Sequence, residues 1–138
     1  MTSQLNVDTI VDKAGTGGSN IKIANTSTHV SDGGSATQNT VQGLVKHWMK
    51  GNTDASLDDS FNTSSGTDNA QGQFTYTFTN NMNNANYSIQ YTSHSAGIVE
   101  TNTDSQTSSS HKFQIFSRPG LSSFADVEHL GLVAGDLA

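Results

Sequence analysis

The side chains in this sequence best suited to metal binding or acid–base catalysis are its five histidines, His29, His47, His94, His111 and His129. Histidine is the commonest metal ligand among side chains and a frequent general base. No two of them have the H-x-x-x-H spacing that places both rings on one helix face, and none belongs to a metal-binding pattern with a carboxylate. We therefore interpret them as histidines at a core edge or on the surface, and we predict no metal site.

The carboxylates do not form a recognisable reaction centre. Asp54, Asp58 and Asp59 lie close together, but the D-x-[DN]-x-[DN]-G pattern of a calcium loop is absent. Glycoside hydrolysis needs two carboxylates that face each other across a sugar cleft, and the two glutamates, Glu100 and Glu128, fall on separate expected strands. The G-x-S-x-G elbow of serine hydrolases and the phosphate loop are also absent. The sequence thus predicts no enzyme, no catalytic residue and no cofactor.

Composition and charge narrow the class of protein. Only 32% of the residues are apolar, compared with about 45–50% in ordinary globular domains. Because charged residues are also scarce, at 13%, the pattern favours thin β-structure with polar outer faces over disorder. The net charge of −6 argues against a nucleic-acid partner, and the absence of cysteine excludes disulfides. No signal segment is visible, and no apolar run approaches the ~20 residues of a membrane span.

Alternation of side chains predicts strands in the second two-thirds of the chain. Its clearest form is Phe74, Tyr76 and Phe78, which alternate with threonines at the two-residue period of a strand. A polar turn separates this run from a second alternating run at 87–91, so we predict an antiparallel hairpin. Residues 64–66 read as a turn. Further strands are predicted over residues 5–11, 21–23, 41–49, 58–62, 97–100, 111–116 and 127–133.

These elements predict an all-β fold in two parts. Residues 1–40 form an extended N-terminal arm, and residues 41–138 form a small antiparallel β-sandwich, jelly-roll-like, with seven or eight strands. Because the core is thin against the entropy of ordering the chain, we predict an oligomer. The predicted core residues are Trp48, Phe61, Phe74, Phe78, Tyr87, Ile89, Val99, Phe113, Ile115, Leu130 and Leu132. Exposed aromatic residues such as Trp48, Tyr87 and Tyr91 would suit stacking on sugar rings, but their alternation favours a buried face.

Two stretches of sequence carry a resemblance to a known family. The first is LNVDTIVDKAG at residues 5–15. The second begins at Lys46 and Trp48, continues through DSFNTSS at 59–65 and TDN at 67–69, and ends with GQFTYTFT at 72–79 and ANYS at 85–88. Together they resemble the small tail-fibre-like or virion structural proteins of marine and cyanobacterial phages, over about half of the chain. The region from Ser93 to Ser110 departs from the family pattern.

The resemblance implies a structural, homotrimeric component of a bacteriophage virion, assembled in the host cytoplasm, with other virion proteins as partners. It supplies no catalytic residues. In the tail-fibre interpretation the arm attaches to the virion or to sister subunits, and an exposed loop contacts the host surface. A capsid head-decoration protein and a glycan-binding receptor-recognition module remain alternatives. The predicted arm residues are Leu5, Val7, Ile10, Val11, Ile21 and Ile23. The predicted host-contact residues are Ser93, His94, Asn102, Asp104 and Gln106.

Overall fold

The computed structural model of this chain divides it into two units, Met1–Val41 and Gln42–Ala138. The residues that the structure describes are 23–24, 26–30, 34–95, 97–101, 105–117 and 123–136. In the first unit, β1 (Thr28–Val30) and β2 (Thr37–Asn39) form an antiparallel hairpin. The side chains of this hairpin are almost all exposed, so backbone hydrogen bonds rather than a core hold its two strands together.

Most of the predicted arm cannot be compared with the structure. Leu5, Val7, Ile10, Val11 and Ile21 lie outside the described residues, as does the strand predicted over 5–11. Ile23 is described and its side chain is 44% exposed.

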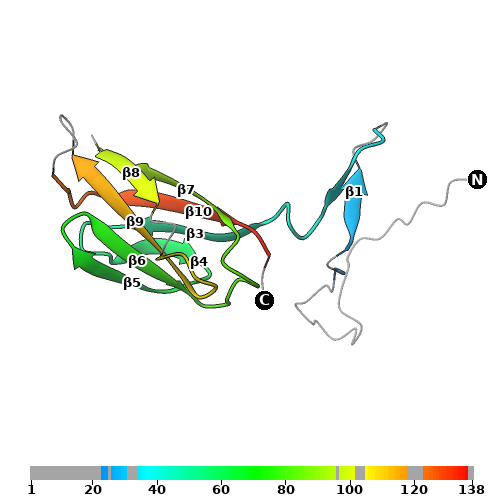
Figure 1. Cartoon of the computed structure of the whole chain (residues 1–138), viewed down its shortest axis with the longest axis horizontal. Coiled ribbons are helices and arrows are strands. Elements are labelled where there is room, and N and C mark those ends of the chain that lie inside the picture. The colour runs from blue at the N-terminus through cyan, green and yellow to red at the C-terminus, as the bar shows by residue number, and fades with distance from the viewer. Residues whose placement is uncertain are drawn as a thin grey trace, which may run out of the picture. The chain divides into compact units, whose positions relative to one another are not determined.

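The described residues of the second unit form eight strands in two antiparallel sheets, which confirms the prediction of an all-β sandwich (Figure 1). We call them sheet I and sheet II. Sheet I has the order β4-β3-β10-β7 and contains β4 (Leu57–Phe61), β3 (Val45–Gly51), β10 (His129–Ala134) and β7 (Ser88–Ser93). Sheet II has the order β5-β6-β9-β8 and contains β5 (Thr63–Ala70), β6 (Gln73–Phe78), β9 (Ser110–Ser117) and β8 (Gly97–Thr101).

Aromatic side chains from the two sheets meet in the core. Phe74 of β6 lies 4.5 Å from the ring of His129 on β10, and Phe113 of β9 lies 4.1 Å from Tyr91 on β7, measured between ring centroids. The predicted alternation of β6 is confirmed, because its three aromatic residues are all buried. Of the other predicted core residues, Tyr87, Phe113 and Ile115 are buried. Ile89 and Val99 are partly buried against the core.

Four predicted core residues are wrong, and they share one face. Trp48, Phe61, Leu130 and Leu132 lie on the outer face of sheet I, where their side chains are 38–51% exposed. In β3 the inward positions are His47 and Met49, on either side of Trp48. The hydrophobic pattern alone cannot choose between these faces, since both carry large side chains.

The predicted hairpin between 74–79 and 87–91 is also wrong. β6 pairs with β5 and β9, whereas β7 pairs with β10 in the other sheet. The chain between them crosses from sheet II to sheet I, and Tyr87 on this crossing packs its ring against Phe78 at 5.6 Å. Because β6 already has a partner on each side, β7 cannot pair with it.

β5 takes the place of the turn predicted at residues 64–66. It follows β4 after Asn62, whose positive φ of 60° turns the chain from one sheet to the other. The Asn62 amide donates to the carbonyl oxygens of Lys46 and Asn80 at 3.0 and 3.1 Å, which fixes this corner. β5 lies at a sheet edge and has mostly exposed side chains. The sequence therefore offers little hydrophobic signal for it.

Candidate functional site

The outer face of sheet I is ordered in rows across its strands. Strand register places Phe61, Trp48, Leu132 and Gln90 side by side, one from each strand. The next row carries Asp59, Lys50, Leu130 and Thr92. Residues in register on adjacent antiparallel strands have neighbouring side chains on the same face. The first row is therefore apolar over β4, β3 and β10, the second row is apolar at β10 alone, and both become polar at β7.

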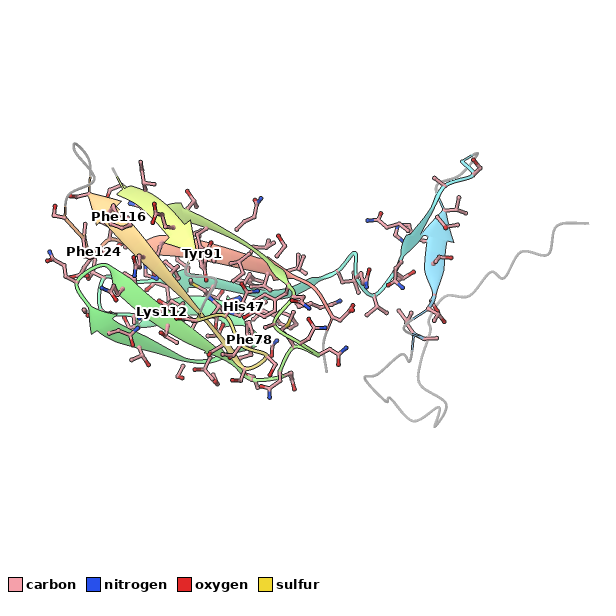
Figure 2. All side chains as sticks on the ribbon, viewed as in Figure 1. His47, Phe78, Tyr91, Lys112, Phe116 and Phe124 are labelled. Carbon is pink, nitrogen blue, oxygen red and sulfur yellow. The ribbon has the colours of Figure 1, made fainter. Side chains whose placement is uncertain are left out.

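The outer face of sheet II is different in character. Thr75 and Thr77 of β6 and Lys112 and Gln114 of β9 point outward there, because their neighbours in sequence point into the core. Phe116 of β9 is covered by Phe124, with 4.7 Å between the ring centroids (Figure 2). The two faces of the sandwich are thus unequal, and the apolar side chains that remain open to solvent gather mainly on sheet I.

Sheet I holds a shallow apolar groove between β3, β10 and β7. Its volume is about 320 Å³, and Trp48, Leu130 and Leu132 form its apolar walls while Gln90 and Thr92 form its rim. Contiguous exposed apolar surface of this kind marks interaction sites in soluble proteins. Trp48 is the single tryptophan of the chain, and it lies within this groove.

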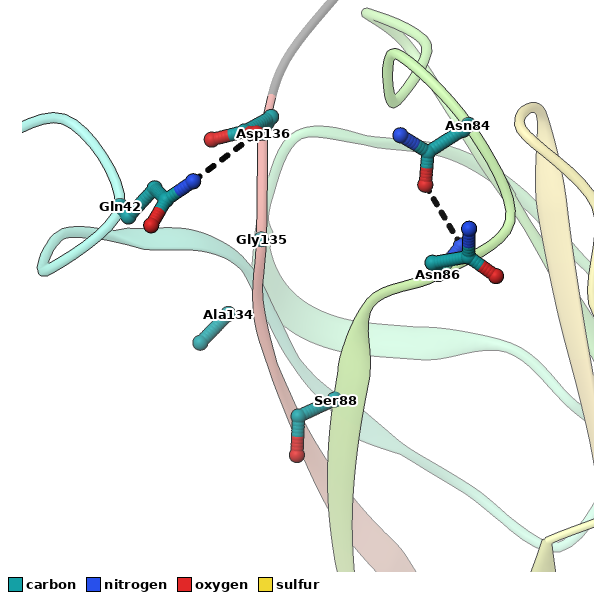
Figure 3. A pocket seen from close by; sticks show the side chains of 7 residues that line it. All are labelled: Gln42, Asn84, Asn86, Ser88, Ala134, Gly135 and Asp136. Atoms are coloured by element: carbon teal, nitrogen blue, oxygen red, sulfur yellow. Dashed lines mark hydrogen bonds between the residues drawn. The ribbon is translucent and has the colours of Figure 1, made fainter. Parts of the chain in front are cut away.

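A polar pocket of about 310 Å³ lies at the end of sheet I where β7 begins and β10 ends. Asn84 and Asn86 reach it from the crossing before β7, and Gln42 and Asp136 reach it from the other side (Figure 3). Ser88 also lines the pocket, and it pairs with Ala134 in the register of β7 and β10. The polar part of the lining consists of three amides, one hydroxyl and one carboxylate, and Ala134 and Gly135 complete it.

Hydrogen bonds fix the shape of this pocket. The backbone N–H of Asn86 donates to Asn84 Oδ1 at 2.7 Å, and Gln42 Nε2 donates to Asp136 Oδ2 at 3.2 Å. The N–H of Asn83 donates to the carbonyl oxygen of Asp136 at 2.8 Å, so the two sides are joined through the backbone. At the base, a Cβ added to Gly135 would lie 2.6 Å from the Cβ of Tyr87. Only glycine allows this close packing.

Two lysines on sheet I are balanced by carboxylates. Burial lowers the pKa of Lys46, and the nearby carboxylate of Asp136 acts in the opposite direction. Lys50 donates a hydrogen bond to the carboxylate of Asp58 on β4 and forms an ion pair with it. This contact raises the pKa of Lys50 and lowers the pKa of Asp58. The row of Phe61, Trp48 and Leu132 therefore carries no charge, and Lys50 in the next row is paired with Asp58.

The structure separates the predicted host-contact residues. Ser93, at the end of β7, donates its hydroxyl to the carbonyl oxygens of Ser95 and Gly97, and the neighbouring His94 is well exposed near Glu128. Gln106 lies by the start of β7 instead, where its amide donates to the carbonyl oxygens of Ala85 and Tyr87 at 2.8 Å. Gln106 thus holds in place the segment between β6 and β7, which carries Asn84 and Asn86. Asn102 and Asp104 lie outside the described residues.

Three histidines occupy the core, which corrects the expectation that they lie at its edge or on the surface. His47, His111 and His129 are fully buried, whereas His29 and His94 are exposed. The Tyr76 hydroxyl lies 2.8 Å from His129 Nε2, and His129 Nδ1 lies 2.8 Å from the carbonyl oxygen of Val127. This arrangement suits a neutral ring that accepts from tyrosine and donates to the backbone. A hydrogen-bonded imidazole can replace an apolar side chain in a core, a substitution that hydropathy does not reveal.

His47 and His111 lie against each other, with 4.9 Å between the two imidazole centroids. His47 also packs against Phe78 (Figure 2). His47 Nε2 lies 2.9 Å from the Thr63 hydroxyl, and His111 Nδ1 is bonded to the Tyr91 hydroxyl. Burial lowers the pKa of His47 to about 4. Burial, followed by the proximity of His47, lowers the pKa of His111 to about 3.

Other candidate chemistry is dispersed over the described part of the chain. Among those residues, no group of three or more histidines and carboxylates is placed to hold a metal ion. Glu100 is exposed on β8, and Glu128 precedes β10 near His94. No helix within the described ranges has the length and hydropathy needed to cross a membrane.

Comparison with known proteins gives no relative: no family model, curated protein or solved structure matches this chain.

Proposed function

We propose that this chain is a non-enzymatic structural module of a bacteriophage virion, a homotrimeric tail fibre or fibre-like appendage whose subunits associate through the outer face of sheet I. The observation that carries the proposal is the apolar surface formed by Phe61, Trp48, Leu132 and Leu130 across three adjacent strands. The resemblance of residues 5–15 and 46–88 to small phage virion proteins supports the virion setting. A capsid-decoration protein is the alternative location.

Charge favours further copies of the same chain as the partner on this face. With a net charge of −6, identical subunits repel one another wherever their acidic surfaces meet. The row of Phe61, Trp48 and Leu132 avoids this cost because it is neutral, and Lys50 in the next row is already paired with Asp58. Each leucine that becomes fully buried would contribute roughly 1.5–3 kcal/mol to association.

We expect the change Leu132→Lys to convert an associated protein into a monomer. The new ammonium group would face its own copies in the middle of the apolar row, where desolvating it is costly. Light scattering on the purified full chain measures the change, as a fall from three times 14.6 kDa to 14.6 kDa. The emission of Trp48, the single tryptophan, should shift to the red as the face becomes solvated.

Ile98→Lys provides the matched control. Ile98 is 36% exposed and lies on β8 at the outer face of sheet II, so the same charge is introduced away from the proposed interface. Mass and emission should both stay unchanged in this variant. A wild-type chain that is monomeric at every concentration, or a Leu132→Lys variant that keeps the wild-type mass, would refute association through sheet I. Antibody labelling of particles then separates a tail position from a capsid position.

A further inference from the structure

We infer that the polar pocket between β7 and β10 is a binding site for a neutral saccharide. The inference rests on the proposed function for its biological setting, since a virion appendage that contacts the host surface meets glycans there. It places recognition at the pocket lined by Gln42, Asn84, Asn86, Ser88 and Asp136, and not at the loop after β7.

The lining matches the chemistry of sugar hydroxyl groups. Each hydroxyl both donates and accepts, and amides, hydroxyls and a carboxylate offer complementary groups at close spacing. Asn84 uses its carbonyl oxygen to accept from the Asn86 backbone N–H, a bond that leaves the Asn84 NH2 group available to a ligand. Within the described chain, no bond engages the side-chain amide of Asn86, which is exposed at the pocket.

Other ligand classes fit this pocket less well. An anion would meet the Asp136 carboxylate, and no arginine or lysine lines the cavity to offset it. A calcium ion needs six to eight oxygen ligands with several carboxylates, whereas Asp136 is the single carboxylate here. An apolar ligand would find only Ala134 and Gly135. The cavity of about 310 Å³ lies at the lower end of the range of ligand pockets, ~300–1,000 Å³.

The pocket lies beside the apolar rows of sheet I. Ser88 and Ala134 are in register on β7 and β10, and two residues further along each strand come Gln90 and Leu132. The pocket therefore continues along the same sheet face into the groove that holds Trp48. Because Leu132 and Trp48 belong to the proposed interface between subunits, we place the ligand in the pocket alone, where its hydroxyl groups bind Asn86 and Asp136.

The pocket is also held in place before a ligand arrives. Asn83 and Asp136 are joined by a backbone hydrogen bond of 2.8 Å. Gln106 holds the carbonyl oxygens of Ala85 and Tyr87, on either side of Asn86. A preorganised site loses less conformational entropy when it binds, which matters for a ligand whose hydrogen bonds replace equally good bonds to water.

Saturation-transfer NMR on the full chain tests the inference with defined probes, the methyl glycosides of glucose, galactose and N-acetylglucosamine, and methyl glucuronide as the charged comparison. We expect at least one neutral glycoside to receive saturation, and the glucuronide to receive little because of Asp136. Asn86→Ala should raise the Kd about tenfold, the effect of losing one or two neutral hydrogen bonds. Ser88→Ala, a smaller change at the same row, should raise it about threefold.

Gln114→Ala is the matched control, because it removes an amide from the outer face of sheet II and should leave the Kd unchanged. No saturation of any neutral glycoside, stronger binding of the glucuronide, or an unchanged Kd in both Asn86→Ala and Ser88→Ala would overturn the inference. Leu132→Lys separates this result from the proposed assembly. If the Leu132→Lys variant is monomeric and still binds a neutral glycoside, the saccharide site is supported independently of assembly. If the wild-type chain is a trimer that binds no glycoside, the saccharide site is refuted and the proposed assembly stands.

Discussion

Acidification from neutral pH to about pH 4 is expected to unfold the sandwich cooperatively, and the buried histidines His47 and His111 are the cause. Burial lowers the pKa of His47 to about 4 and that of His111 to about 3, whereas an unfolded histidine titrates near 6.5. Between these values the unfolded chain binds protons that the folded chain excludes. Stability is therefore complete above about pH 6.5 and is lost progressively as the pH falls.

The size of the effect follows from the same values. A difference of one in pKa corresponds to about 1.4 kcal/mol, so by about pH 4 the two histidines together destabilise the fold by roughly 6 kcal/mol. That loss is comparable to the whole stability of a small domain, about 5–15 kcal/mol. Burial also lowers the pKa of His129, which adds to the loss. Surrounding groups offer no compensation, since His47 and His111 face each other, Tyr91, Phe78 and Thr63.

Urea titrations at neutral pH and at about pH 5 measure this dependence. His111→Gln should remove about half of the stability difference between the two pH values, whatever its effect at neutral pH. His94→Gln is the control, because His94 is exposed and should leave the difference unchanged. The exposed carboxylates Asp54 and Asp58 have pKa values lowered by their hydrogen bonds to Ser56 and to Lys50. Their protonation thus falls below this pH window. Equal stability at the two pH values in the wild-type chain would contradict the account.

Truncation of a core phenylalanine should have the second large effect. Phe113 is fully buried, and its ring contacts Phe74, Tyr76, Tyr91 and His129. Phe113→Ala removes that packing and leaves a cavity between the sheets, at an expected cost of about 3–5 kcal/mol in the free energy of unfolding. Denaturant unfolding followed by near-UV circular dichroism measures the change.

Phe61→Ala is the matched comparison for this measurement. Phe61 is 51% exposed on β4, so its removal should cost less than about 1 kcal/mol in the unfolding of a subunit. The same substitution should weaken association, because Phe61 belongs to the outer row of sheet I. Similar losses of unfolding free energy in the two variants would mean that the two faces of sheet I are assigned incorrectly.

The architecture could largely be predicted from the sequence. Phe74, Tyr76 and Phe78 have threonines between them, and only one face of such a strand is suited to a core. The alternation therefore determined both the presence and the orientation of β6. Low apolar content and scattered turn residues likewise predicted an all-β fold, which the two antiparallel sheets confirm. These features are local, since each depends on residues within one strand.

The inward face of sheet I could not be predicted in this way. In β10, His129, Gly131 and Val133 alternate with Leu130 and Leu132, and hydropathy favours the leucines as the core. The structure buries the first set. A Cβ on Gly131 would lie 2.8 Å from the ring of Tyr91, so the inward positions have to be small there. His129 also forms a hydrogen bond with the hydroxyl of Tyr76, a residue distant in sequence.

Strand pairing decided the rest of the candidate site. Gln42, Asn86 and Asp136 come from three distant segments, and they share a pocket because β10 lies between β3 and β7. The sequence by itself determined the class of fold, the polar composition and which strands alternate, since these depend on side chains a few residues apart. Only the tertiary structure decided which face of sheet I is open and where the polar pocket lies, because both depend on contacts between residues that are far apart along the chain.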